Sequence, residues 1–339
     1  MRLTVAIRIG SGILGVMTGR RVLVTGGAGY VGSIVVAELL GRGCHVRVLD
    51  ALLHGSVPSL LLPWGGPNFE FVRGDVRDND VRPQVLEDID SVVHLAAIVG
   101  DPACARQPEL AWQVNLEATK ALVEDARAAG VERFVFASTC SNYGKMTDDG
   151  YADEDFDLQP VSLYAETKVA AEREILATNG TLAPTCLRFA TVYGTSPRMR
   201  FDLTVNEFTC ELALKNELLV FGEQFWRPYV HVRDAARAIV ETLVAPLSAV
   251  RQEVYNVGDT RENYRKLDIV EILRERFPDA AIEFVHKDED PRDYRVSFEK
   301  FASRMGFTAS RSVEQGIDEI LTLVRSGLLD DPYAATYRN

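Results

Sequence analysis

The stretch that decides the fold runs from Arg20 to Gly32 and reads Arg-Arg-Val-Leu-Val-Thr-Gly-Gly-Ala-Gly-Tyr-Val-Gly. Its apolar part, residues 22–24, has the composition of a strand that is buried on both faces of a parallel sheet. Glycines follow at once, and Gly26, Gly29 and Gly32 are spaced evenly. Such a turn lets a pyrophosphate approach the backbone where the next helix begins. The stretch therefore predicts a strand, a phosphate-binding turn and a helix.

An acidic residue after the next strand indicates which dinucleotide is bound. The predicted helix ends at residues 41–43, a strand follows over 45–49, and Asp50 comes directly after it. A carboxylate at this place accepts hydrogen bonds from both hydroxyls of an adenosine ribose. It would repel a 2′-phosphate, and residues 51–53 supply no compensating cation. The sequence therefore predicts NAD rather than NADP.

The rest of the chain extends the same pattern. Short apolar runs alternate with helical stretches up to about residue 190, which predicts a parallel sheet covered by helices on both faces. The fold class we expect is α/β, a doubly wound parallel sheet of the Rossmann type with a smaller mixed C-terminal substrate lobe. Further strands are predicted at 69–72, 91–95, 134–137, 185–189 and 254–257, and long helices at 108–129 and 162–179.

The pattern changes beyond residue 194, where loops and charged helices replace the regular alternation. We predict an N-terminal extension at 1–18 and an NAD-binding domain at 19–194, to which 229–260 return. A substrate-binding lobe is predicted at 195–228 and 261–330.

Composition narrows the partners. The chain has 339 residues and a formal net charge of −12, which argues against nucleic acid as a partner. No apolar run is long enough to span a bilayer. The five cysteines are scattered and form no C-x-x-C pair, so we expect no metal site and a reducing cytoplasm as the location.

Tyr164 and Lys168 carry the clearest chemical meaning. Positions four apart on a helix share a face, so the phenol and the ammonium point the same way. A nearby cation lowers the pKa of a phenol, and an oxidised nicotinamide adds further positive charge. Such a tyrosine can act as a general base near neutral pH. Ser138 and Thr139, at the end of the preceding strand, offer hydroxyls that would hold a substrate oxygen.

Taken together, these motifs resemble the extended short-chain dehydrogenase/reductases, in their nucleotide-sugar epimerase and dehydratase branch. The resemblance spans about residues 20 to 325. It implies that Tyr164 is the catalytic base and acid, that Lys168 is its electrostatic partner, and that Thr139 binds the sugar oxygen. The cofactor contacts expected on these grounds are Gly26, Gly29, Tyr30, Val31, Gly32, Asp50, Asp75, Val76, Leu95, Ala96, Ala97, Asn115, Tyr164 and Lys168. The expected substrate contacts are Ser138, Thr139, Thr191, Asn206, Arg227 and Arg292, of which the two arginines would bind the diphosphate.

Three positions depart from the family pattern. Members that eliminate water carry an Asp-Glu pair after the active-site threonine, where this chain has Cys140 and Ser141. Decarboxylating members also carry a glutamate at the position of Ser141. Many epimerases have an asparagine where this chain has Thr191. Dehydration and decarboxylation therefore lose support, and one substrate contact differs.

The first functional interpretation is an NAD-dependent 4-epimerase of a nucleoside-diphosphate sugar. Tyr164 would take the proton of the 4-hydroxyl, and a transient 4-keto sugar would be reduced again on its other face. The second interpretation is a 4-ketoreductase or 4-dehydrogenase of a deoxysugar pathway that uses the same residues. The third is a dinucleotide-binding regulator without activity, which the presence of Tyr164, Lys168 and Thr139 disfavours. The resemblance also implies a homodimer formed through the helices at 108–129 and 162–179.

Overall fold

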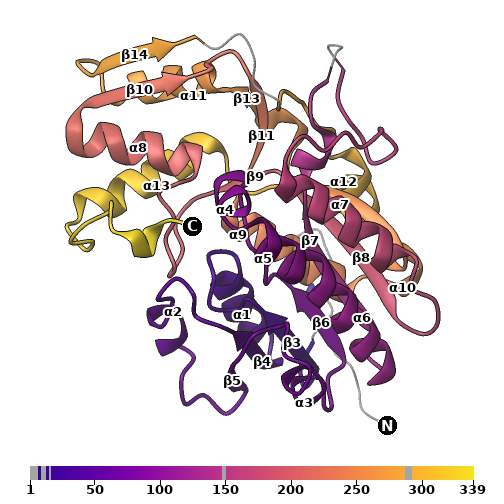
Figure 1. Cartoon of the computed structure of the whole chain (residues 1–339). Helices are drawn as coiled ribbons and strands as arrows, with labels where there is room; N and C mark the ends of the chain where they lie inside the picture. Colours follow the sequence, from indigo (N-terminus) through magenta and orange to yellow (C-terminus); the bar gives the residue numbers. More distant parts are fainter. Residues whose placement is uncertain (1–6, 9–12, 15–16, 147–149, 287–291) are drawn as a thin grey trace.

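The computed structural model describes residues 7–8, 13–14, 17–146, 150–286 and 292–339 (Figure 1). Its centre is a seven-stranded sheet in the order β12-β8-β7-β6-β3-β4-β5, and all its strand pairs are parallel. The strand order reverses between β3 and β6, and in such sheets ligands bind at that point, outside the carboxyl ends. The seven predicted strands are confirmed. They are β3 (Arg21–Thr25), β4 (His45–Asp50), β5 (Phe69–Arg73), β6 (Ser91–His94), β7 (Arg133–Thr139), β8 (Ala183–Phe189) and β12 (Glu253–Val257).

Helices cover both faces of this sheet. On one face α1 (Gly32–Gly41) packs against α9 (Val232–Val244), and on the other α6 (Ala118–Ala128) packs against α7 (Leu163–Leu176) (Figure 1). The helix predicted at 108–129 consists of α5 (Pro108–Trp112), the π-helical turn η1 (Gln113–Glu117) and α6. The doubly wound α/β class is therefore confirmed.

A smaller part lies over the carboxyl ends of the sheet. In it α8 (Thr204–Lys215) packs against α13 (Val313–Arg325), and β10 (Glu217–Phe221) pairs with β14 (Ala281–Val285) in parallel. A three-stranded sheet joins β13 (Asn263–Arg265), β11 (Trp226–His231) and β9 (Thr191–Tyr193). Between β11 and β13 the chain passes through α9 and adds β12 to the main sheet. The division into domains stays a prediction.

Short elements complete the described part. They are β1 (Ile7–Arg8), β2 (Ile13–Leu14), α2 (Pro58–Leu61), α3 (Val81–Val85), α4 (Asp101–Arg106), α10 (Leu247–Val250), α11 (Lys266–Arg274), α12 (Glu299–Met305) and the 3₁₀ turns η2 (Cys140–Tyr143), η3 (Thr260–Glu262) and η4 (Ala335–Tyr337). Much of the predicted extension at 1–18 lies outside the described residues, although β1 and β2 pair with each other in it. In the described ranges, the helices are all too short or too polar to cross a bilayer.

Candidate active site

The glycine turn is packed so closely that side chains would not fit. Gly26 has φ +72°, and a Cβ there would lie 2.8 Å from the amide nitrogen of Ala96, at the end of β6. A Cβ on Gly32 would lie 2.1 Å from the carbonyl oxygen of Gly26. The turn thus packs directly against the chain that follows β6, at the crevice between β3 and β6.

A cavity of about 430 Å³ lies at this crevice, between the main sheet and the smaller part. Its size is that of a small-molecule site. Most predicted site residues line it, although they come from distant parts of the chain. They are Gly26, Gly29, Tyr30, Val31, Gly32, Asp50, Asp75, Val76, Leu95, Ala96, Ala97, Ser138, Thr139, Tyr164, Lys168, Thr191, Arg227 and Arg292.

Asp50 is held in place at the end of β4. One carboxylate oxygen accepts a hydrogen bond from the amide of Ala28, at 3.0 Å, and the other accepts one from the amide of Leu52, at 2.8 Å. Burial raises the pKa of this carboxyl, while the two amides act in the opposite direction. A fixed carboxylate at this edge suits the hydroxyls of an adenosine ribose. Asp75 differs, because its ion pair with Arg77 at 2.7 Å lowers its pKa.

Tyr164 and Lys168 lie together as their spacing predicted. The Lys168 ammonium is 5.9 Å from the centre of the Tyr164 ring and donates a hydrogen bond to the carbonyl of Ala137 at 2.9 Å. Burial raises the pKa of the phenol and lowers that of the ammonium to about 8. The pKa of the phenol is therefore not lowered in the chain by itself, because desolvation is the largest influence on it. An oxidised nicotinamide beside the phenol would add positive charge and favour its deprotonation.

The hydroxyls of Thr139 and Ser138 have different surroundings. Thr139 Oγ1 accepts a hydrogen bond from the amide of Ser141 and lies 2.8 Å from its hydroxyl, at the edge of the cavity. Ser138 donates to the buried carboxylate of Glu172 and accepts from the side-chain amide of Asn142. Both residues line the cavity, but the hydroxyl of Ser138 is already engaged by Glu172 and Asn142. Thr139 therefore has the hydroxyl that is better placed to meet a substrate.

Two predicted contacts, Asn115 and Asn206, do not line the cavity. Asn115 is 1% exposed, and its amide binds both backbone groups of Ile98 and the hydroxyl of Thr167. It thereby ties the loop after β6 to α7. Asn206 accepts from the amide of Gly194 and donates to other groups of the same loop. Both asparagines hold cavity walls in position, and direct contact with ligands stays a prediction for them.

The arginines predicted to bind the substrate diphosphate lie near one another. Arg292 forms an ion pair with Asp101 at 2.8 Å, and the Arg227 guanidinium lies 5.4 Å from the ring centre of Tyr294. Both side chains line the cavity, as do Asp101 and Tyr294. A diphosphate would compete with Asp101 for Arg292. Thr191 lies at the start of β9 and also lines the cavity.

The sequence analysis missed two further arginines that line the cavity. Arg198 and Arg200 lie in the loop between β9 and α8, and they are 5% and 9% exposed. The signal was present in Arg198-Met199-Arg200-Phe201, where basic and large apolar residues alternate. What could not be read from the sequence is that the loop folds inward.

Fold and cavity together define a dinucleotide-dependent enzyme of the Rossmann class with a tyrosine and lysine pair. A sequence model described as the NAD dependent epimerase/dehydratase family matches residues 22–258, and the chain belongs to this family. The UDP-glucose 4-epimerase of Corynebacterium glutamicum is 30% identical, over 93% of this chain and 98% of its own length. UDP-glucuronic acid decarboxylase 1 of Arabidopsis thaliana is 28% identical, over 92% and 71%. The structure of Thermus thermophilus UDP-glucose 4-epimerase in complex with NAD superimposes with a TM-score of 0.76 at 28% identity, over 91% of this chain and all of that one.

Proposed function

We propose that the protein is an NAD-dependent 4-epimerase of a nucleoside-diphosphate sugar. The observation that carries this proposal is the composition of one cavity. The cavity is lined by the glycine turn and Asp50 together with Tyr164, Lys168 and Thr139. The two residues that follow Thr139 in the sequence, Cys140 and Ser141, are not acidic. The relatives named UDP-glucose 4-epimerase support the same activity. The fit to NAD rests on the turn, where Gly26 and Gly32 leave no room for a Cβ, and on the fixed carboxylate of Asp50.

The residues of the chain hold the sugar and move one proton. Thr139 binds the sugar O4, the Tyr164 phenolate takes the proton of that hydroxyl, and the resulting phenol later gives the proton back. Lys168 supplies positive charge beside the phenol and thereby stabilises the phenolate. The chemistry that NAD supplies when bound is the reversible oxidation of the sugar C4. Inversion then requires only that the flat keto sugar turns over before it is reduced.

The residues after Thr139 favour epimerisation over the other reactions of the family. Cys140 is buried, its thiol donates to the carbonyl of Arg188, and burial raises its pKa. Ser141 shares a hydrogen bond with Thr139. Neither side chain can act as a carboxylic acid or carboxylate, and eliminating water from a 4-keto sugar needs both an acid and a base. The dehydratase and decarboxylase activities of relatives are therefore not proposed here.

The test is to incubate the purified protein with UDP-glucose or UDP-galactose and follow the sugar by NMR. An epimerase converts each into the same mixture without net consumption of a nicotinamide cofactor. A ketoreductase or dehydrogenase instead changes the amount of NAD(P)H in proportion to the product, and that result would replace our proposal by the second interpretation. Other nucleotide sugars follow in the same assay, since the relatives' names do not decide the sugar for this chain.

A homodimer and a cytoplasmic location belong to the same proposal. In support of the dimer, α6 and α7 lie side by side on the outer face of the sheet (Figure 1). In support of a reducing compartment, the five cysteines are buried and unpaired. Light scattering on the purified protein tests the dimer, because a monomer has half the mass. Cell fractionation tests the location.

A further inference from the structure

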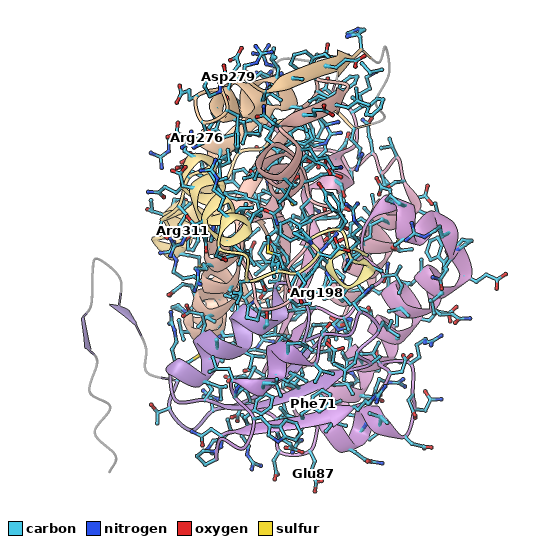
Figure 2. The ribbon with its side chains drawn as sticks, turned by 90° about the vertical axis from the view of Figure 1, so that its left-hand side faces the viewer. Phe71, Glu87, Arg198, Arg276, Asp279 and Arg311 are labelled. Atoms are coloured by element: carbon cyan, nitrogen blue, oxygen red, sulfur yellow. The ribbon has the colours of Figure 1, made fainter. Side chains whose placement is uncertain are left out.

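The guanidinium of Arg198 is buried without a full set of partners. One of its terminal nitrogens donates to the carbonyl of Arg338 at 3.0 Å, and its Nε is buried without an acceptor among the described residues. Burial lowers the pKa of Arg198 to about 10, and the neighbouring Arg200 acts in the same direction. Arg198 is 5% exposed and lies near the middle of the outline in Figure 2, whereas the exposed Arg311 lies near its left edge. Asp202 and Asp50 act on the pKa of Arg198 in the opposite direction, but Asp202 is paired with Arg200, and neither carboxylate forms an ion pair with Arg198 among the described residues. The buried charge of Arg198 can therefore take a further anionic partner.

The loop that carries Arg198 lies against the glycine turn. The hydroxyl of Ser196 donates to the carbonyl of Tyr30 at 2.6 Å, and the phenol of Tyr30 donates to the carbonyl of Gly194 at 2.6 Å. A third contact joins Ser196 to the hydroxyl of Ser33, in the first turn of α1, at 3.0 Å. The loop therefore closes the cavity where the amino end of α1 points into it.

Arg198 and the pair Arg227 and Arg292 lie beside different groups of the cavity, which Arg77, Lys168 and Arg200 also line. Arg198 acts electrostatically on Asp50, at the ribose end of the predicted dinucleotide site. Arg227 and Arg292 instead act on Tyr294, where both oppose the rise in pKa that burial causes. An epimerase cavity must hold two diphosphates, one in the cofactor and one in the sugar nucleotide. Two sets of cations match this requirement.

We infer that Arg198 binds the diphosphate of the dinucleotide from the side opposite the glycine turn. The inference rests on the proposed function, because it takes NAD as the occupant of this end. Residues 25–33 include no basic side chain, so the turn offers amides and the end of α1 but no full positive charge. A guanidinium can supply that charge through two parallel hydrogen bonds. Arg200 has no such role, because Asp202 already binds it twice, at 2.9 and 2.7 Å.

This arrangement ties the cofactor to the smaller part of the protein. The Arg200 carbonyl accepts from the side-chain amide of Asn206, in α8, and the Phe201 amide donates to the carbonyl of Tyr337. Releasing the dinucleotide then requires the loop to leave the glycine turn. Slow release suits an enzyme that regenerates its cofactor in every cycle, and differences in affinity usually lie in the rate of release.

The experiment measures cofactor binding in the full chain, not turnover. Wild type, Arg198→Gln and Arg198→Lys are titrated with NAD⁺, ADP-ribose, adenosine and UDP by calorimetry, after bound nucleotide has been removed. The matched control is Arg311→Gln, which removes the same charge from an exposed position. Thermal unfolding without ligand shows whether each variant is folded. If Arg198→Gln does not fold, the lysine variant decides the question, because it keeps the charge and loses the paired hydrogen bonds.

We expect Arg198→Gln to weaken the binding of NAD⁺ and ADP-ribose by about 10- to 100-fold, which is the range for losing a hydrogen bond to a charged group. Arg198→Lys should weaken the binding of both ligands by several-fold. Adenosine, which lacks phosphate, should bind to both variants with the same affinity as to the wild type. Unchanged NAD⁺ binding in a folded Arg198 variant would overturn the inference. Weaker binding of UDP alone would also overturn it, because the arginine would then belong to the substrate site. An equal loss of affinity for adenosine would overturn it too, because the arginine would then have a structural role. A wild-type chain that binds no NAD⁺ would refute the proposed function itself.

Discussion

The buried carboxylate of Glu172 should be far more important for stability than its neighbours on the same helix. Its two oxygens accept from Arg188 at 2.7 and 3.1 Å, from the amide of Asn142 at 3.0 Å and from the hydroxyl of Ser138. The Glu172 and Arg188 side chains are only 3% and 6% exposed. Glu172→Gln keeps the shape but leaves the guanidinium without a counter-ion. Breaking a buried pair in this way costs about 3–5 kcal/mol.

Glu174 provides the control, because it lies two residues away on α7. Its ion pair with Lys120, at 3.2 Å, is about half exposed on both sides, and such pairs contribute about 0–1 kcal/mol. The assay is urea unfolding of wild type, Glu172→Gln and Glu174→Gln with the same cofactor loading. We expect the free energy of unfolding to fall by at least about 2 kcal/mol more for Glu172→Gln than for Glu174→Gln. A difference below about 1 kcal/mol would show that the network behind the active site is not held together by this charge pair.

Three further predictions concern the site. Tyr164→Phe should lower epimerase activity by about 10²- to 10⁴-fold while NAD⁺ binding, measured separately, stays within a few-fold of wild type, and retained activity would remove the phenol from the mechanism. Asp50→Asn should weaken NAD⁺ binding and reduce the discrimination against NADP⁺ in parallel titrations. An unchanged ratio of the two affinities would contradict the role of the carboxylate. Burial lowers the pKa of His94 to about 3, against 6.5 in an unfolded chain. Below pH 6.5 the unfolded chain therefore holds a proton that the folded chain lacks. As the pH is lowered from 6.5 towards 3, the free energy of unfolding falls by up to about 1.4 kcal/mol per pH unit. His94→Gln should reduce this slope between pH 6 and 4 in urea unfolding, and equal slopes would assign acid sensitivity to other groups.

Much of the fold was predictable because its signals are local. A strand covered on both faces needs a nearly continuous apolar run, and residues 22–24 in β3 are completely buried. The pairing of Tyr164 with Lys168 follows from helix geometry alone. Asp50 was predictable because it comes at the end of a strand beside the glycine turn, and parallel strands bring their carboxyl ends to one edge.

The second half of the site was less predictable, since it depends on loops that pack across long separations. Asn206 matched a family position for a ligand contact, but it is not among the residues that line the cavity. Its side-chain amide instead donates to the hydroxyl of Tyr30, which is 176 residues away in the sequence. Nor could spacing show that Lys168 donates to the carbonyl of Ala137, or that burial raises the pKa of the Tyr164 phenol. These outcomes depend on how much water each group loses on folding.

The sequence by itself determined the doubly wound sheet, the dinucleotide turn and the identity of the tyrosine and lysine pair, because each follows from residues close together in the chain. Tertiary structure alone decided which hydroxyl is engaged by a buried carboxylate, which asparagines support the cavity walls, and that Arg198 is buried. The physical reason is that hydrogen bonding, burial and charge compensation depend on neighbours from other elements. Those neighbours are fixed only when the smaller part packs over the carboxyl ends of the sheet.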